Sequence, residues 1–594
     1  MHLKTKLTAL AAAISLAFMA SSNAFADATI TSTGVGNNAN IEQDASTAAN
    51  AAIVQNGTGN TAGIPGATPS DPAATIGILQ KNSSAVSALV NQSGVNNASS
   101  VIQDSASNSK ASVSQSGTGN QASANQTGDK QTASVNQSGN GNAADVNQSG
   151  ANQNATVNTV DSNGAKAKIA QTDGTAAGNT AIIVQENVIN QLATISQSGN
   201  AEAATITQKN GAREGSATVV QAGNANAAAV TQTNTWFSNA SVNQVGGANQ
   251  ANVVQGDLAD YSTAIVNQSG NGYTATVNQN GGTVFPGGGA VQGLYSATVN
   301  QSGGNDSTVS ITQTNGYKDV AIVNQFGTHH ETATVWQTGS ENEAKVTQTA
   351  GAKEGSANVA QSGNGNHANV LQQDTWFSNA SVKQGGSQNT ANVTQGGLAD
   401  YSTASVEQNG NNQVATINQS GGTVTPGGGV VQGLYNATVN QTGDSNTVTV
   451  NQLNGYKDAA SVVQNGSFQT ASVYQASGNT DLATVAQEGT LNAANIVQTK
   501  SANSVASISQ GGANNDGSVN QGGVALNAKI AQTGDWNYAN IVQAGSGSVA
   551  SIAQSGDGNS FATRNTAAIL QSGNGFAASI TQAGNSNHAS IWQH

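Results

Sequence analysis

Apolar and polar residues alternate along short stretches of this chain, and these stretches recur over almost its whole length. One of them, Ala-Ser-Val-Asn-Gln-Ser-Gly-Asn-Gly-Asn, spans residues 133–142 and has Val135 and Gln137 on the same side of the alternation. A period of two around a β-branched residue predicts a strand whose alternate side chains face opposite sides. Gly139 and Asn142 predict a turn after it, because both residue types tolerate positive φ.

The same unit returns at a nearly constant interval. Val146 and Gln148 repeat the roles of Val135 and Gln137. About 44 glutamines stand at this position, mostly 11 to 13 residues apart, which is typical of a repeat architecture. Two units make roughly 22 residues, enough for one flattened coil of two strands. The sequence therefore predicts an all-β fold, a β-solenoid of about 22 stacked strand-turn-strand coils with a cross-β core.

Stacking gives a physical reason for the recurring amides. An isolated coil buries too few apolar side chains to offset the entropy of ordering its backbone, so each coil depends on its neighbours. A buried amide can donate to and accept from its copies above and below, whereas a carboxylate there would stack like charges. The residues expected to form the ladders, the core and a fibre are Gln115, Asn120, Val135, Gln137, Gly139, Asn142, Val146, Gln148, Gln361, Asn366, Gln571, Ile591 and Gln593.

The N-terminal residues have the three parts of a secretory signal peptide. Lys4 and Lys6 form a basic region, residues 7–20 form an apolar stretch, and Ala24-Phe25-Ala26 has the A-x-A form of a cleavage site. Residues 1–26 are therefore predicted to be a signal peptide that is removed after Ala26. No later stretch is long and apolar enough to predict a membrane span.

Two levels of organisation follow this leader. Residues 27–80 are predicted to hold imperfect N-terminal repeats, interrupted by a Pro- and Gly-rich insertion at residues 56–73, and residues 81–594 form the main array. The last unit ends one residue before the C-terminus. Without a polar cap after it, its strand edge is expected to template another chain.

A longer duplication lies on top of the short repeat, around residues 212–480. The segment Thr235–Val242 returns as Thr375–Val382, displaced by about 140 residues. Two further insertions, at residues 281–295 and 421–435, contain the matching proline-bearing loops. Nothing in their sequences indicates a separate fold or a specific role.

Composition narrows the range of functions. Only 8% of the residues are charged, cysteine is absent and the net charge is −13. Removal of Lys4 and Lys6 with the leader leaves 15 basic against 30 acidic residues, a net charge of −15. This acidity disfavours nucleic-acid binding, and the lack of cysteine excludes disulfides and thiolate metal sites.

No candidate catalytic or metal site is convincing, and no cofactor is expected. The best metal-like cluster is His329-His330-Glu331, which is better explained as an exposed turn. Asp257, Asp260 and Asp400 are expected to be solvated turn residues, since no base accompanies them. No serine stands in a nucleophile elbow followed by a helix, so the chain is not expected to be an enzyme.

The repeat resembles the curlin repeat of bacterial curli fibre subunits. That repeat has a glutamine, a glycine two residues later and an asparagine five residues later, followed by a second strand that ends in glutamine. Matching residues in this chain are Gln115, Gly117 and Asn120; Gln137, Gly139 and Asn142, followed by Gln148; Gln361, Gly363 and Asn366; and Gln571 with Gly573.

The resemblance covers nearly all of residues 27–594. It implies a secreted structural subunit of an extracellular functional amyloid, a pilus- or fimbria-like fibre that supports the biofilm matrix, adhesion and aggregation. The implied partners are other copies of this chain, a curli nucleator and the proteins of a secretion channel in a Gram-negative bacterium. Neither nucleic-acid binding nor membrane insertion is implied.

Other functions remain open on the sequence. The chain could be a nucleator or minor subunit, or a monomeric secreted β-solenoid that binds ice or carbohydrate. Ice binding favours a uniform outward array of threonines, whereas the outward pairs here vary, for example Thr334 with Trp336. A disordered Asn/Gln-rich tract is disfavoured by the regular apolar positions.

Overall fold

The computed structural model describes residues 3–8, 27–62, 77–174, 177–284, 290–291, 293–424, 430–431, 433–558 and 560–594. The chain divides into two compact units, Met1–Val299 and Asn300–His594. Strands in both units belong to two parallel sheets, called sheet A and sheet B here. Strands of the two sheets alternate along the sequence, so that each pair of successive strands forms one coil.

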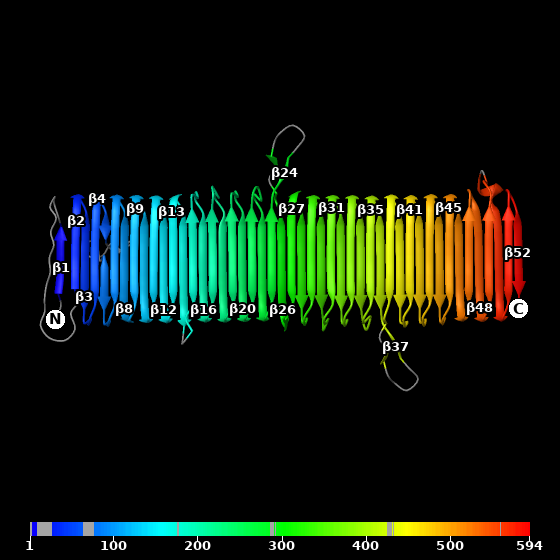
Figure 1. The fold of residues 1–594 in the computed structure, drawn as a ribbon, viewed down its shortest axis with the longest axis horizontal. Coiled ribbons are helices and arrows are strands. Elements are labelled where there is room, and N and C mark those ends of the chain that lie inside the picture. The colour runs from blue at the N-terminus through cyan, green and yellow to red at the C-terminus, as the bar shows by residue number, and fades with distance from the viewer. Residues whose placement is uncertain are drawn as a thin grey trace, which may run out of the picture. The chain divides into compact units, whose positions relative to one another are not determined.

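The strands of the first unit stack in sequence order within each sheet (Figure 1). Sheet A contains β3 (Asn38–Asp44), β5 (Thr61–Ala62), β6 (Ile78–Lys81), β8 (Ala98–Ser107), β10 (Gln121–Asp129), β12 (Ala143–Ala151), β14 (Lys166–Gly174), β16 (Leu192–Asn200), β18 (Ser216–Asn224), β20 (Asn239–Gly247) and β22 (Thr263–Asn271). Sheet B contains β2 (Asp27–Val35), β4 (Asn50–Thr58), β7 (Ser87–Val95), β9 (Lys110–Thr118), β11 (Thr132–Asn140), β13 (Asn154–Asn163), β15 (Thr180–Glu186), β17 (Ala203–Lys209), β19 (Ala227–Thr233), β21 (Gln250–Gly256) and β23 (Thr274–Asn280).

The second unit repeats this arrangement. Its sheet A contains β28 (Val320–Phe326), β30 (Glu343–Thr349), β32 (His367–Gln373), β34 (Thr390–Gly396), β36 (Val414–Ser420), β40 (Thr447–Leu453), β42 (Thr470–Ala476), β44 (Ala493–Thr499), β46 (Asp516–Val524), β48 (Asn537–Ser546), β50 (Asn565–Asn574) and β52 (His588–Gln593). Its sheet B contains β27 (Thr308–Tyr317), β29 (Thr332–Ser340), β31 (Ser356–Asn364), β33 (Asn379–Ser387), β35 (Thr403–Asn411), β39 (Asn436–Asp444), β41 (Ala459–Ser467), β43 (Leu482–Thr490), β45 (Val505–Ala513), β47 (Asn527–Thr533), β49 (Val549–Ser555) and β51 (Ala577–Ala583).

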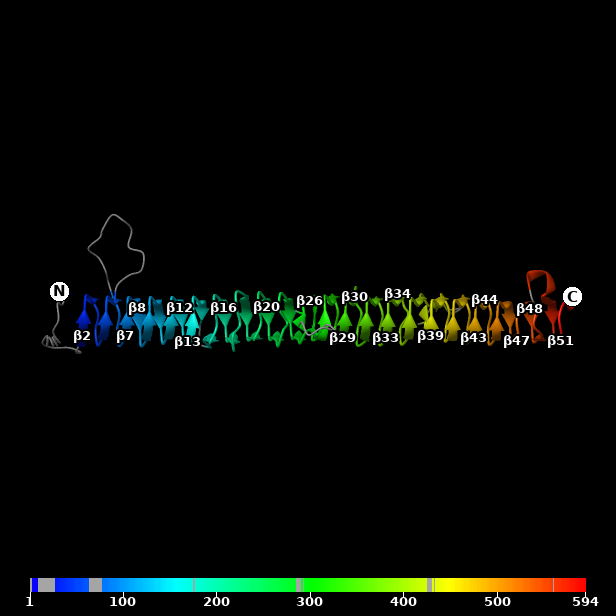
Figure 2. The same cartoon turned by 90° about the horizontal axis from the view of Figure 1, so that it is seen from above.

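Like residues pair with like residues along each sheet. In β11, Val135 pairs with Val113 on one side and with Val157 on the other, and Gln137 pairs with Gln115. Within each unit the two sheets form two layers, with β8, β12 and β16 in one layer of the first unit and β7 and β13 in the other (Figure 2). Alternate side chains of each strand are buried between the layers, as the period of two requires.

A few elements stand outside this pattern. The strand β26 (Ser296–Asn305) contains the boundary between the two units. Two short hairpins, β24 (Thr283–Val284) with β25 (Ala290–Val291) and β37 (Thr423–Val424) with β38 (Val430–Val431), leave the stacked strands (Figure 1). The 3-10 turn η1 (Phe561–Thr563) precedes β50. These hairpins lie in the insertions expected at residues 281–295 and 421–435.

The leader is described in part. The strand β1 (Leu3–Thr8) pairs antiparallel with β3, with Leu3 opposite Gln43 and Thr8 opposite Asn38. The expected cleavage site at Ala24-Phe25-Ala26 lies outside the described residues. Residues 63–73 of the first insertion also lie outside them. Within the described part of the chain, no helix has the length and apolar character needed to cross a membrane.

The predicted fold class is confirmed. The chain is nearly all strand and forms a parallel β-solenoid of about 23 turns, close to the 22 or so that the repeat count predicts. The coils of such a solenoid are stable because each one supplies hydrogen-bond partners to the next. Most of the stability therefore comes from contacts between neighbouring repeats.

Candidate functional site: the amide ladders

A buried glutamine near the end of most strands bonds to its equivalent in the next coil. Gln115 Nε2 donates to Gln137 Oε1 at 2.9 Å, and in the other sheet Gln126 Nε2 donates to Gln148 Oε1 at 3.0 Å. Gln148 Nε2 also donates to the backbone carbonyl of Thr132, in the facing sheet, at 3.0 Å. This glutamine ladder therefore joins the coils along the stack and the two sheets across it.

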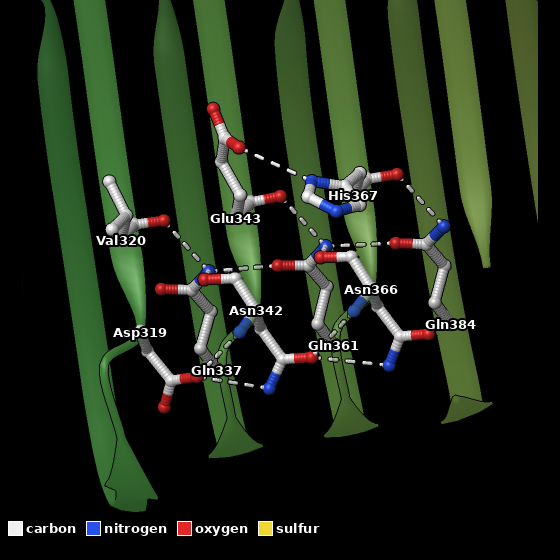
Figure 3. A network of polar contacts seen from close by, with 9 residues as sticks. All are labelled: Asp319, Val320, Gln337, Asn342, Glu343, Gln361, Asn366, His367 and Gln384. Atoms are coloured by element: carbon white, nitrogen blue, oxygen red, sulfur yellow. Dashed lines mark hydrogen bonds and ion pairs between the residues drawn. The ribbon is translucent and has the colours of Figure 1, made fainter. Parts of the chain in front are cut away.

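The second unit shows the same geometry (Figure 3). Gln337 Nε2 donates to Gln361 Oε1 at 2.8 Å, and Gln361 Nε2 donates to Gln384 Oε1 at 2.9 Å. Gln361 Nε2 also reaches the carbonyl of Glu343, in the facing sheet, at 2.9 Å. All three glutamines are buried, so their amides hydrogen-bond to equivalent amides of neighbouring coils and not to water.

The glutamine ladder is interrupted at Thr159, where the sequence departs from the repeat. Thr159 occupies the glutamine position next to Gln137, and its hydroxyl bonds to Gln185 Oε1 at 3.3 Å. Gln137 is fully buried, and its Nε2 has no hydrogen-bond partner among the described residues. An unsatisfied buried donor costs about 1–3 kcal/mol, so this rung weakens the stack locally.

A second set of rungs lies at the edges of the coils, at the residue immediately before each strand. We call the rungs before sheet A strands edge ladder A and those before sheet B strands edge ladder B. The edge rung Asn142 donates its backbone N–H to Asn120 Oδ1 at 3.0 Å. Its Nδ2 donates to the carbonyls of Ser138 and Ser162, each at 3.0 Å. One asparagine thus closes its own turn and holds the next coil.

Close packing fixes the other expected positions. Val135 and Val146 are buried in the core. Gly139 has φ of 106°, and a β-carbon there would collide with the carbonyl oxygen of Ser162 in the next coil. Glycine is therefore required at this position by both backbone conformation and space.

The last described coil differs from the interior ones. Gln571 Nε2 donates to Gln593 Oε1 at 2.7 Å, so the glutamine ladder continues to β52. Ile591 and Gln593 are only half-buried, and the side chain of Trp592 is 70% exposed. Ile591 pairs with Ile569 on one side, and no further described strand pairs with β52.

Several edge rungs are carboxylates, which sequence reasoning did not identify. Asp319 stands in edge ladder A and is fully buried; its Oδ1 accepts from the backbone N–H and Nδ2 of Asn342 at 2.9 and 3.1 Å (Figure 3). Glu202, Glu331, Asp458 and Asp481 stand in edge ladder B and are at most 1% exposed. Asp319 Oδ2, Asp458 Oδ2 and Glu202 Oε2 have no hydrogen-bond partner among the described residues.

Burial changes the acidity of these groups. Loss of water raises the pKa of Asp319, Glu331 and Asp458 each to about 7, and hydrogen bonds to the carboxylates offset this only in part. Burial likewise raises the pKa of Glu202 to about 7 and raises that of Asp481. Burial therefore favours the protonated, uncharged form of these carboxylates, which lessens the like-charge repulsion expected of such a stack.

Two expectations about acidic residues were wrong. Glu331 does not lie in an exposed turn: its Oε2 accepts from Gln348 Nε2 at 2.6 Å and its Oε1 from the N–H of Gly355 at 3.0 Å. Asp260 and Asp400 are also buried, and each accepts a 2.7 Å hydrogen bond from the backbone N–H of a tryptophan, Trp236 or Trp376. Each of these two aspartates therefore joins its own turn to the turn of the preceding coil, which the local sequence does not reveal.

The ladders provide hydrogen-bond donors and acceptors, and the described residues show no metal cluster beside them. Among the described residues, no group of three or more His, Cys, Asp and Glu side chains could hold a metal ion. The ion pairs among the described residues are exposed and isolated, for example His367 Nδ1 with Glu343 Oε2 at 3.2 Å (Figure 3). Such exposed pairs contribute little stability.

Comparison with known proteins agrees with the ladder geometry. Residues 106–139, 315–349 and 562–594 match the curlin associated repeat. The first match contains Gln115, Asn120 and Gln137, and the third contains Gln571 and Gln593. No curated protein matches the chain. Together with the parallel β-solenoid, these three matches support a curlin-repeat family.

Proposed function

We propose that this protein is a secreted structural subunit that assembles with copies of itself into an extracellular curli-like amyloid fibre. The observation that carries the proposal is the glutamine ladder, because each rung presents to the next coil the same donor and acceptor that it receives. A coil from a second chain offers the same groups at the same spacing. In this role the chain has no enzymatic activity and needs no cofactor.

The coil that contains β52 shows which groups a coil from a second chain would cover. The half-buried Ile591 and Gln593 occupy positions that hold a buried Val or Ile and a buried Gln in most of the described strands. Stacking of a further coil would bury them and satisfy the backbone groups at the edge of β52. Matrix cohesion, adhesion and aggregation would follow from the fibre, and the curlin repeats support such a curli-like role.

The expected route and partners belong to the same proposal. Residues 1–26 direct export and are removed after Ala26, and the fibre forms at the surface of a Gram-negative cell. Partners are other copies of the chain, a nucleator and the proteins of a secretion channel. The net charge of −15 that remains after removal of residues 1–26 keeps unassembled chains apart in solution and disfavours nucleic acid.

The first test is assembly kinetics after dilution from denaturant, followed by thioflavin fluorescence. A sigmoidal rise that preformed fibres shorten supports a polymerising subunit. A rise without a lag supports the nucleator role instead. A flat trace from a folded, β-rich chain contradicts fibre formation and leaves a monomeric solenoid.

A matched pair of variants tests whether the last coil takes part. Ile591→Asp places a charge on the face that a further coil would cover. Ser590→Asp places the same charge on the neighbouring exposed residue, which faces the other way. We expect the first variant to slow fibre elongation at least tenfold and the second to leave it within about twofold. Equal effects would contradict stacking through this coil.

A further inference from the structure

Edge ladder B of the second unit contains three buried carboxylates that no cation among the described residues neutralises. Glu331, Asp458 and Asp481 precede β29, β41 and β43, and each is at most 1% exposed. Asp458 and Asp481 are consecutive rungs, since Asp481 donates its backbone N–H to Asp458 Oδ1 at 3.1 Å. Two adjacent buried charges of the same sign are unfavourable at this spacing.

Among the described residues, no ion pair supplies the aspartate pair with a compensating charge. Tyr435 is the rung before Asp458, and its hydroxyl donates to the carbonyl of Gly421. Lys457, in the turn of Asp458, places its Nζ 5.0 Å from the ring centroid of Tyr456. On the far side, Asp481 accepts from Ser501 Oγ at 2.6 Å and from the backbone N–H of Ser504 at 2.9 Å.

The surroundings of Glu331 are similar. Its carboxylate accepts from the amide of Gln348 and the backbone of Gly355. In its own turn, His330 lies 3.8 Å from the exposed Asp306, and on the next turn Lys353 lies over the ring of Trp376 at 5.0 Å. In the described part of the chain, no ion pair involves Glu331, Asp458 or Asp481.

Close packing excludes a bound cation, so protonation is the way in which these carboxylates lose their charge. A β-carbon at Gly455 would collide with Asp458 Oδ2, and one at Gly478 would collide with Asp481 Oδ2. The carboxylates therefore lie directly against glycine backbone, without space for a coordinated cation and its ligands. Protonation removes the charge and gives Asp458 Oδ2, which has no partner among the described residues, a hydrogen to donate.

We propose that the second unit takes up protons as its coils fold, at the rungs Glu331, Asp458 and Asp481, so that mildly acidic conditions favour the folded stack. In the unfolded chain these groups are solvated and ionise near pH 4. Between that value and about 7 the folded unit binds more protons than the unfolded chain. The folding equilibrium constant then rises up to about tenfold per pH unit and per proton as pH falls through this window.

The test is a potentiometric titration of the full chain, folded and in denaturant, between pH 4.5 and 7.5. We compare the unmodified chain with Glu331→Gln/Asp458→Asn/Asp481→Asn. Asparagine and glutamine already serve as edge rungs at Asn446 and Gln469, so the variant is expected to fold. At pH 6 its proton uptake on folding should be lower by about two to three protons.

The control neutralises three exposed acids, Glu341→Gln/Glu354→Gln/Glu488→Gln, which should leave uptake on folding unchanged. An effect no larger than that of this control would overturn the proposal. An independent readout is the infrared band of a protonated carboxylic acid in the folded, unmodified chain at pH 6. Its absence would also overturn the proposal, whether or not the variant folds and whether or not chains join into fibres.

Discussion

The two edges of the same coils in the second unit carry different chemistry. From Asn342 to Asn515, edge ladder A is built from amides. Asn492 Nδ2 donates to the carbonyls of Glu488 and Gly512, both at 2.9 Å, and its Oδ1 accepts from the N–H of Asn515 at 3.0 Å. Edge ladder B has Asp458 and Asp481 at the equivalent positions, and Asp458 Oδ2 is buried without a partner among the described residues.

This difference shows how asparagine and aspartate meet the same hydrogen-bonding requirement at an edge rung. An asparagine supplies both the acceptor for the next rung and the donors for its own turn, at every pH. An aspartate supplies the same acceptor, but it can donate only when it is protonated. The backbone of the solenoid tolerates both, and the pH response of each edge is set by which one is present.

The strongest test of this comparison moves a carboxylate to the amide edge. Asn492→Asp removes both donors and places a charge beside two carbonyls. We expect a loss of about 3–5 kcal/mol in unfolding free energy at pH 8, partly recovered at pH 5. Guanidinium denaturation at the two pH values measures it. A loss independent of pH would mean that size or packing, and not charge, distinguishes the edges.

A core variant separates edge effects from general weakening. Ile496 is fully buried, and it pairs with Val473 and Val519 in the neighbouring coils. Ile496→Ala should cost about 3 kcal/mol through the lost burial and the cavity that it leaves. The same denaturation experiment should give equal losses at pH 5 and pH 8. A pH-dependent loss would show that the core and the edges are coupled.

The reverse exchange makes the carboxylate edge resemble the amide edge. Asp458→Asn should add about 1–2 kcal/mol at pH 8, where the aspartate is charged, and nothing near pH 4. The sign follows from the raised pKa of about 7: the folded state gains stability from the proton below that value and loses this gain as pH rises through it. Hydrogen exchange of the Asp481 N–H, which donates to Asp458 Oδ1, reports the effect locally.

The smallest expected effect concerns the gap in the glutamine ladder of the first unit. Thr159→Gln should give Gln137 Nε2 the acceptor that it lacks and stabilise the stack by about 1 kcal/mol at all pH values. Thr159→Val is the matched control, since it changes the same residue to one of similar shape and introduces no amide. A gain for both variants would assign the effect to packing.

Much of the fold could be read from the sequence because the repeat is strict. The alternation around Val135 gave the strand, and the interval between Gln137 and Gln148 gave the coil. The buried carboxylates were missed because each stands at a turn, where an acidic residue is expected to be solvated, as in Gly455-Tyr456-Lys457-Asp458. A signal was present: Asp458 stands six residues before Gln464, the same offset as Asn142 before Gln148.

The sequence by itself determined the strand and turn positions, the parallel in-register stacking and the amides that join the coils, because each depends on local alternation and on one repeat meeting its copy. Only the tertiary structure decided which polar side chains are buried. Burial at an edge rung depends on the coils before and after it, and therefore on residues more than twenty positions away. The raised pKa values of Glu331, Asp458 and Asp481 follow from that burial.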